Sequence, residues 1–336
     1  MATIVEFKDY SMGFKDDDGK VFNLLDRLCL RVEAGKALGV VGESGCGKSM
    51  TSLSAMRLLP DAATVQGGEI LLEGEDLLQM SEEEMRRVRG NKLAMIFQEP
   101  MTALNPVLTI GQQIGEVLTL HHPEMNAQEV RERVIQSLAE VGIAAPETRV
   151  DQYPHEFSGG MRQRVMIAMA IANRPDILIA DEPTTALDVT VQEQIVNLLN
   201  ELKKKLNMSV MFISHDLAVI RKIADRVLVM KDGRVVEEGT VKRIFENPSH
   251  AYTKDLINAH MLLKKQNKEG KVLLRAENVR VTFPLKKNLW GKTVEELRAV
   301  DGVSFELPQG TTLGVVGESG SVSYTHLRAH ETCADL

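Results

Sequence analysis

The eight residues GESGCGKS, from Gly42 to Ser49, constrain the fold of this 336-residue chain more than any other segment. They follow an apolar run of strand length at Ala37–Val41 and precede a helical pattern at Ser49–Leu59. Glycines let consecutive backbone N–H groups turn inward around phosphate oxygens, and the helix N-terminus adds a positive dipole there. A purely structural glycine turn would not require Lys48 and Ser49. The segment therefore predicts a phosphate-binding loop between a strand and a helix.

Further apolar runs have strand length and do not alternate with polar residues. Such runs suit strands that are buried on both faces of a mostly parallel sheet. They are found at Leu93–Phe97, Ile177–Ala180, Val210–Ile213 and Arg226–Met230. Helical patterns at Glu129–Val141 and Met161–Ala172 lie between the first two of these runs. The arrangement predicts an α/β fold.

Two carboxylates, Asp181 and Glu182, directly follow one of the apolar runs. Ligands bind at the carboxyl ends of parallel strands, so Asp181 is expected to hold Mg²⁺ through water. Glu182 beside it is suited to orient or deprotonate an attacking water. Lys48 is expected to reach the β- and γ-phosphates, and the Ser49 hydroxyl to ligate Mg²⁺. An ordinary solvated turn is the alternative for the two carboxylates, and the phosphate loop upstream disfavours it.

Composition limits the kinds of partner that the chain can bind and the cellular compartment in which it can work. The formal net charge is -7, so no overall basic field recruits nucleic acid. The three cysteines, Cys29, Cys46 and Cys333, fit neither a disulfide framework nor a Cys-x-x-Cys metal site, which favours a reducing cytoplasm. The N-terminus MATIVEFKDY has no apolar core of signal-peptide length, and no run approaches the roughly 18 apolar residues of a spanning helix. A membrane role would therefore require partner subunits.

The segment FSGGMRQR at Phe157–Arg164 opens a helix with two glycines and forms a second potential anion site. Some twenty residues before the Asp-Glu pair, it resembles the signature sequence of ATP-binding-cassette proteins. Met161 stands where the wider family more often has Gln, a departure shared by many peptide-import members. It does not affect the phosphate contacts expected of Ser158–Gly160.

Other segments resemble further marks of this family in the same order. Gln98 resembles the Q-loop glutamine, Ala186–Asp188 the D-loop, His215 the switch histidine, and Phe14 the aromatic that stacks on adenine. Each alone could be a polar cap or a core residue, but their order and spacing favour the family. The resemblance covers about residues 1–262. It implies a phosphate-loop NTPase core with a mostly parallel sheet, an antiparallel β subdomain and a helical subdomain.

The resemblance also implies a set of site residues, with ATP and Mg²⁺ as cofactors. The catalytic residues would be Glu182, His215 and Gln98, and the metal ligands Ser49, Gln98 and Asp181. The residues expected to contact the nucleotide are Phe14, Gly42, Glu43, Ser44, Gly45, Cys46, Gly47, Lys48, Ser49, Met50, Ser158, Gly159, Gly160 and Asp188.

A finer resemblance is to the peptide, oligopeptide and nickel importer branch of the family. It rests on the segments Phe97–Ile114, Ser158–Ala170 and Asp181–Thr190. The segment NPSHAYTKDLI at Asn247–Ile257 is similar to the C-terminal tail of that branch, with Ala251 where Pro is commoner.

An exact repeat indicates a second cassette. LGVVGESG at Leu38–Gly45 recurs at Leu313–Gly320, where GESGCGKS becomes GESGSVSY. We expect a complete cassette at 1–262, a linker at 263–271 and the truncated β portion of a second cassette at 272–320. The residues 321–336 resemble a translated sequencing adapter, so a non-native tail is expected there. Two cassettes in one chain are similar to the double-cassette members that import glutathione or dipeptides.

The resemblance implies an ATPase of the translocase class that energises import of a dipeptide, oligopeptide, glutathione or nickel. Its partners would be two transmembrane permease subunits and an extracytoplasmic solute-binding protein, at the cytoplasmic face of a bacterial inner membrane. In this family two cassettes close head to tail on two ATP molecules, so the partner surface would come from a second cassette in cis or from a homodimer. Residues 272–320 lack the lysine, the Asp-Glu pair and the signature, so we expect ATP binding without an intramolecular sandwich.

Two alternatives remain open. One is a non-transport cassette ATPase of translation or DNA repair, which the acidic composition and the short insertion between Gln98 and Ser158 disfavour. The other is a non-functional fragment.

Overall fold

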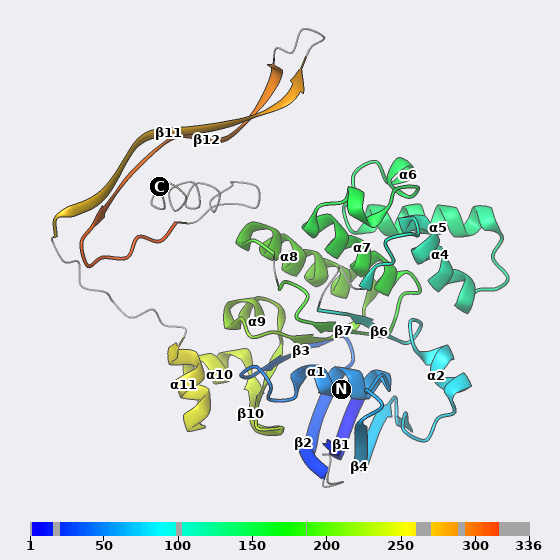
Figure 1. Ribbon diagram of the computed structural model, residues 1–336. Helices are drawn as coiled ribbons and strands as arrows, with labels where there is room; N and C mark the ends of the chain where they lie inside the picture. Colours follow the sequence, from blue (N-terminus) through cyan, green and yellow to red (C-terminus); the bar gives the residue numbers. More distant parts are fainter. Residues whose placement is uncertain are drawn as a thin grey trace. The chain divides into compact units, whose positions relative to one another are not determined.

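The computed structural model describes residues 2–15, 21–98, 103–185, 187–259, 270–287 and 293–315. The chain divides into two compact units (Figure 1). The first comprises residues 1–187 and 191–261, and the second residues 188–190 and 262–336. None of the helices described is both long and apolar enough to span a bilayer.

A six-stranded sheet forms the centre of the first unit. Its strand order is β10-β9-β3-β8-β7-β6, and every pair is parallel except β10 with β9. The strands are β3 (Ala37–Val41), β6 (Leu93–Ile96), β7 (Ile177–Asp181), β8 (Ser209–Ile213), β9 (Arg226–Lys231) and β10 (Arg234–Thr240). All five apolar runs predicted as strands are strands of this sheet, so the prediction of a mostly parallel sheet is confirmed.

Both faces of this sheet are covered. Along β7, Leu178 and Ala180 belong to one hydrophobic cluster, whereas Ile177 and Ile179 belong to another. All four side chains are fully buried. Burial on both faces explains why the strand sequences are continuously apolar.

An antiparallel sheet and two helices cover one face. The sheet has the order β2-β1-β4-β5. Its strands are β1 (Thr3–Lys15), β2 (Val21–Glu33), β4 (Ala63–Leu72) and β5 (Glu75–Asp76), and the helices are α1 (Lys48–Met56) and α2 (Glu82–Val88). Helix α1 ends three residues before the predicted Leu59. The reason is that Arg57 takes the left-handed conformation, with φ 50°, and its N–H closes the last turn on Leu53 and Ser54.

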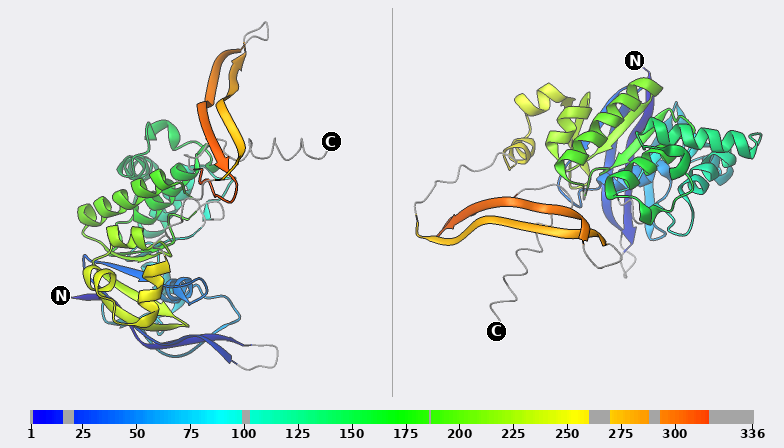
Figure 2. Two further views of the ribbon diagram at one scale, coloured as in Figure 1. Left: turned by 90° about the vertical axis from the view of Figure 1, so that its left-hand side faces the viewer. Right: turned by 90° about the horizontal axis from the view of Figure 1, so that it is seen from above.

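Helices cover the other face and appear in green in Figure 1, on the side of the sheet away from the blue strands; Figure 2 shows the same separation. They are α4 (Ile110–His121), α5 (Ala127–Glu140), α6 (Pro146–Arg149), α7 (Gly159–Ile171), α8 (Val189–Leu206) and α9 (Leu217–Ile223), with a 3₁₀ turn at Pro154–Glu156. Helix α5 begins two residues before the predicted Glu129. The reason is that Asn126 and Glu129 form a capping box that fixes its start.

The first unit ends with α10 (Val241–Glu246) and α11 (Ala251–Ala259). The predicted linker lies almost wholly outside the described residues, as do the second glycine loop and the expected tail at 321–336. In the second unit, β11 (Val272–Lys287) and β12 (Thr293–Pro308) pair antiparallel. The prediction of β-structure in this segment is thus confirmed.

Candidate active site

The loop from Gly42 to Gly47 joins the fully buried strand β3 to helix α1. Gly45 and Gly47 have φ of 82° and 100°, which side chains rarely adopt. A Cβ at Gly47 would also lie 2.5 Å from the Leu25 side chain. No atom within 4 Å would obstruct a Cβ at Gly45, so this side of the loop is open. The loop has the turned backbone and the helix N-terminus that a phosphate group requires.

Lys48 is 5% exposed, and its ammonium group donates to the carbonyl oxygens of Gly42 (2.8 Å) and Glu43 (2.9 Å). These two bonds hold the lysine across its own loop. Cys46 is buried beside it, with its sulfur 3.9 Å from the ammonium nitrogen. Burial raises the pKa of the Cys46 thiol, although Lys48 opposes the shift. The thiol is therefore neutral at physiological pH.

The loop is connected to the end of strand β7 through hydroxyl groups. Ser49 donates to Oδ1 of Asp181 (3.1 Å), and Ser52 donates to Oδ2 (3.4 Å). Burial raises the pKa of Asp181, and Glu182 adds to this effect, while the Ser49 hydroxyl opposes it. Ser49 and Asp181 thus place two oxygen atoms side by side next to the loop. Hydroxyl and carboxylate oxygens are the ligands that Mg²⁺ prefers, so these residues fit the implied metal.

Three side chains converge on one carboxylate oxygen of Glu182. Gln98 donates to Oε2 from its amide (3.3 Å), Thr185 donates from its hydroxyl (2.9 Å), and Nδ1 of His215 lies 3.1 Å away. Glu182 itself has φ 46°, a left-handed conformation that costs a non-glycine residue about 1–2 kcal/mol. Strained backbone of this kind clusters at functional sites.

The structure therefore brings together most of the predicted site at the carboxyl ends of β3, β6, β7 and β8. Lys48, Ser49 and Asp181 form one group, and Gln98, Glu182 and His215 form a second group beside it. Gln98 contacts Glu182 through its amide nitrogen, and in the part of the chain that the structure describes no hydrogen bond joins Gln98 to Ser49 or Asp181.

The signature residues lie elsewhere in the first unit. Ser158 caps α7, accepting from the N–H of Met161 (3.4 Å), and Gly159 and Gly160 form the first turn. A Cβ at Gly160 would come within 2.7 Å of Val191, which explains the glycine sterically. Helices α1 and α7 pack on opposite faces of the sheet. Within the described residues, no hydrogen bond connects Ser158, Gly159 or Gly160 with the phosphate loop.

The remaining predicted residues have less defined surroundings. Phe14 is half-buried near the end of β1 and pairs across the sheet with Phe22, whose side chain is 68% exposed. Met50 packs against the core beneath the antiparallel sheet. Asp188 immediately precedes α8, and Ala186 lies outside the described residues.

Two residues near the site escaped sequence reasoning. Thr185 lies three residues after Glu182 and is not among the predicted site residues, although a hydroxyl at that spacing can close a local turn. Tyr252 on α11 lies in the segment Asn247–Ile257, and nothing in that segment predicts a contact with the loop, yet its hydroxyl accepts a hydrogen bond from the N–H of Glu43 (3.0 Å).

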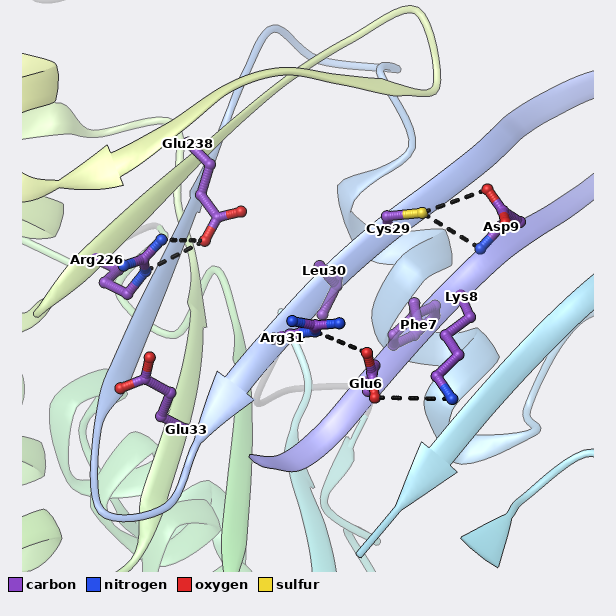
Figure 3. A pocket seen from close by; sticks show the side chains of 10 residues that line it. All are labelled: Glu6, Phe7, Lys8, Asp9, Cys29, Leu30, Arg31, Glu33, Arg226 and Glu238. Atoms are coloured by element: carbon purple, nitrogen blue, oxygen red, sulfur yellow. Dashed lines mark hydrogen bonds and ion pairs between the residues drawn. The ribbon is translucent and has the colours of Figure 1, made fainter. Parts of the chain in front are cut away.

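A hollow of about 470 Å³ lies apart from these residues, beside strands β1, β2, β9 and β10 (Figure 3). Its charged side chains pair largely with each other: Arg31 with Glu6 (2.7 Å) and Arg226 with Glu238 (2.8 Å). None of the predicted site residues lines it, and we assign it no ligand.

Comparison with known proteins agrees with this geometry. A family model described as "ABC transporter" matches residues 25–185. The chain is 49% identical over 270 residues to the oligopeptide transport ATP-binding protein of Bacillus subtilis, covering 80% of this chain and 75% of that protein. Among solved structures, the dimeric structure of MJ0796, a bacterial ABC transporter cassette, has a TM-score of 0.64 at 28% identity, covering 71% of this chain and 99% of the other.

Longer relatives match nearly the whole chain. It is 48% identical over 321 residues to the peptidoglycan transport ATP-binding protein of Agrobacterium fabrum, covering 95% of this chain. It is 42% identical over 362 aligned positions to the glutathione import ATP-binding protein of Escherichia coli K12, covering 98% of this chain. The chain spans 58% of the length of each of these relatives. The expected fold and the resemblance to the peptide and glutathione importer branch are both confirmed.

Proposed function

This chain belongs to the ABC transporter family, and on that premise we propose that it binds and hydrolyses ATP to energise the import of a peptide or a related small solute across a membrane. Dipeptides, oligopeptides, glutathione and nickel form the proposed solute class. The proposal depends on two groups of side chains at the edge of the sheet. In one, beside the loop, Ser49 is hydrogen-bonded to Asp181. In the other, Gln98 and His215 contact the carboxylate of Glu182.

The proposed roles follow from chemistry and position. The loop N–H groups and Lys48 bind the phosphates, for which the ammonium group exchanges its two carbonyl partners for phosphate oxygens. Ser49 and Asp181, with Gln98, hold Mg²⁺, which when bound neutralises charge on the phosphate oxygens. Glu182 orients the attacking water and accepts its proton, while Gln98 and His215 hold the carboxylate in place. Phe14 stacks on the adenine.

The signature residues are proposed to act on a nucleotide held by another cassette. The helix N-terminus at Ser158–Gly160 is a second anion site on the face of the sheet opposite α1. A site composed of the loop of one cassette and Ser158, Gly159, Gly160 and Asp188 of another would surround the phosphates from both sides. The partner surface is proposed to come from a second cassette or a second copy of the chain.

We further propose the partners and the place of action. They are two transmembrane permease subunits and an extracytoplasmic solute-binding protein, with the cassette at the cytoplasmic face of a bacterial inner membrane. We also propose that residues 1–262 form one complete cassette and that residues 272–320 belong to a second one, because LGVVGESG occurs in both.

Reconstitution tests the transport function. The full chain is combined in proteoliposomes with the two proposed permease subunits and the proposed solute-binding protein. The expected result is ATP-dependent uptake of a labelled peptide that is lost with Lys48→Ala. ATP hydrolysis that neither the permeases nor the loaded binding protein stimulates, with no uptake, would contradict the proposal.

A further inference from the structure

Helix α11 reaches back to the phosphate loop from the far end of the first unit. The hydroxyl oxygen of Tyr252 accepts a hydrogen bond of 3.0 Å from the backbone N–H of Glu43, the second residue of the loop. The Tyr252 side chain is buried, with 7% exposed. This contact joins two segments 209 residues apart in the sequence, and the family model at residues 25–185 does not include α11.

The bond acts on a single peptide unit. The carbonyl oxygen of Gly42 and the N–H of Glu43 belong to the same peptide group, which is trans because no cis peptide occurs in the described chain. In a trans peptide the C=O and the N–H point in opposite directions. Lys48 therefore holds this peptide from one side, at 2.8 Å, and Tyr252 holds it from the other.

Nucleotide binding would remove one of these two restraints. When Lys48 turns to the phosphates, as the proposed function requires, it no longer holds the Gly42 carbonyl. Tyr252 then remains as the side-chain partner of that peptide. A loop kept in its binding-competent orientation binds more tightly, because apparent affinity scales with the population of the competent state.

Several contacts fix Tyr252 itself. The carboxylate of Glu237 accepts from the N–H groups of Ser249 (2.8 Å) and His250 (3.0 Å) just before α11 begins. Although burial alone raises the pKa of Glu237, its hydrogen bonds, led by that from the Ser249 N–H, outweigh burial and lower the pKa, so the carboxylate stays charged. The ammonium group of Lys231 lies 4.9 Å from the centre of the Tyr252 ring. The N–H of Tyr252 also donates to Nδ1 of His250 (3.2 Å), so the tyrosine is held both at its ring and at its backbone.

We propose that Tyr252 is a positioning residue for the phosphate loop, setting the orientation of the Gly42–Glu43 peptide and thereby the affinity for nucleotide. The inference rests on the proposed function, since it concerns the same loop. It extends the site to a helix beyond the residues that the family model matches, and gives α11 a role in nucleotide binding.

The test is Tyr252→Phe, which removes the hydroxyl and keeps the ring beside Lys231. Tyr153→Phe is the matched control, since that tyrosine is 40% exposed and lies outside the proposed site. Binding of a fluorescent ATP analogue to the full chain gives the affinity, and amide hydrogen exchange without nucleotide reports the Glu43 N–H. We expect Tyr252→Phe to raise the dissociation constant about 3- to 10-fold, the factor that one net hydrogen bond typically gives, and to speed exchange at Glu43.

A second variant, Glu237→Gln, weakens the attachment of α11 without touching the tyrosine. It should shift affinity and exchange in the same direction by a smaller factor. Unchanged affinity in Tyr252→Phe would overturn the inference, and so would weaker binding with unchanged exchange at Glu43. Failure of the wild-type chain to bind the analogue would instead overturn the proposed function, and exchange at Glu43 would then decide alone whether Tyr252 holds the loop.

Discussion

The hydroxyl of Ser49 lies 3.1 Å from Oδ1 of Asp181 and donates to it, although 132 residues separate the two in the sequence. Strands β3 and β7 are both neighbours of β8, and their carboxyl ends meet at one edge of the sheet. This parallel arrangement brings the first residues of α1 to the end of β7. The pair marks the place where the proposed Mg²⁺ would bind.

Replacing Ser49 with Ala should uncouple metal from nucleotide. When the Ser49 hydroxyl is removed, Asp181 keeps only Ser52 as a hydroxyl donor, and the proposed Mg²⁺ loses a ligand. We expect hydrolysis to fall by about 10²-fold, on the order of the loss of one charge-stabilising group. Titration calorimetry should show that Mg²⁺ no longer tightens ATP binding. Ser54→Ala is the control, since Ser54 donates to the Met50 carbonyl within α1; an equal loss there would contradict the assignment.

Asp181→Asn should stabilise the fold while abolishing hydrolysis. Because burial raises the pKa of Asp181 above its ordinary value of 3.8, the folded state binds the proton more tightly than the unfolded state. Ionised Asp181 therefore destabilises the fold at neutral pH, and that penalty disappears as the pH falls through the raised pKa. We expect Asp181→Asn to raise the free energy of unfolding at neutral pH by about 0.5–2 kcal/mol, the usual gain from one stabilising substitution.

Urea denaturation at pH 7.5 and pH 5 measures this effect. At pH 7.5 the variant should unfold at a higher urea concentration than the wild type. At pH 5 the difference between their two midpoint concentrations should be smaller. A variant less stable than the wild type at pH 7.5 would show that the ionised carboxylate is instead needed for folding.

Thr185 should affect turnover more than binding. Its hydroxyl is the shortest of the three contacts to Oε2 of Glu182 and helps to orient the proposed general base. We expect Thr185→Ala to lower kcat about 3- to 10-fold, the effect of one hydrogen bond, with KM unchanged. Thr185→Ser, which restores the hydroxyl, should recover most of the rate. A raised KM with normal kcat would place Thr185 in substrate binding instead.

Alanine variants of Phe14 and Phe22 test which of the two aromatic rings stacks on the adenine. Stacking on a base is worth about 1–3 kcal/mol, so Phe14→Ala should weaken ATP binding by about 5-fold or more. Phe22→Ala, at the paired position on β2, should leave the affinity within about 2-fold, which is near the weakest effect of one lost contact. The reverse result would move the proposed platform to Phe22. Equilibrium binding of ATP to both variants measures the difference.

The motifs predicted the centre of the site because local sequence encodes local geometry. The position of the loop Gly42–Ser49 follows from the strand before it and the helix after it. The position of Asp181 follows from the buried strand that it ends, so both could be predicted from the sequence. The contact from Tyr252 to Glu43 could not, because no periodicity or spacing signals a bond across 209 residues.

Helix ends were the least predictable elements for a similar reason. The apolar pattern at Ser49–Leu59 continues past Met56, but the left-handed turn at Arg57 ends α1 there. That turn depends on backbone conformation, which composition does not reveal. The convergence of Gln98 and His215 on Glu182 likewise depends on the order of strands in the sheet.

Complementation between two inactive variants tests the composite ATP site most directly. Lys48→Ala damages the loop and keeps the signature, whereas Ser158→Arg blocks the signature and keeps the loop. ATP hydrolysis by each full-length variant alone, and by their mixture, is measured over a range of protein concentrations. The account predicts wild-type activity that rises with concentration, two inactive variants, and a mixture that recovers part of the wild-type rate. A mixture as inactive as its components, beside an active wild type, would contradict it.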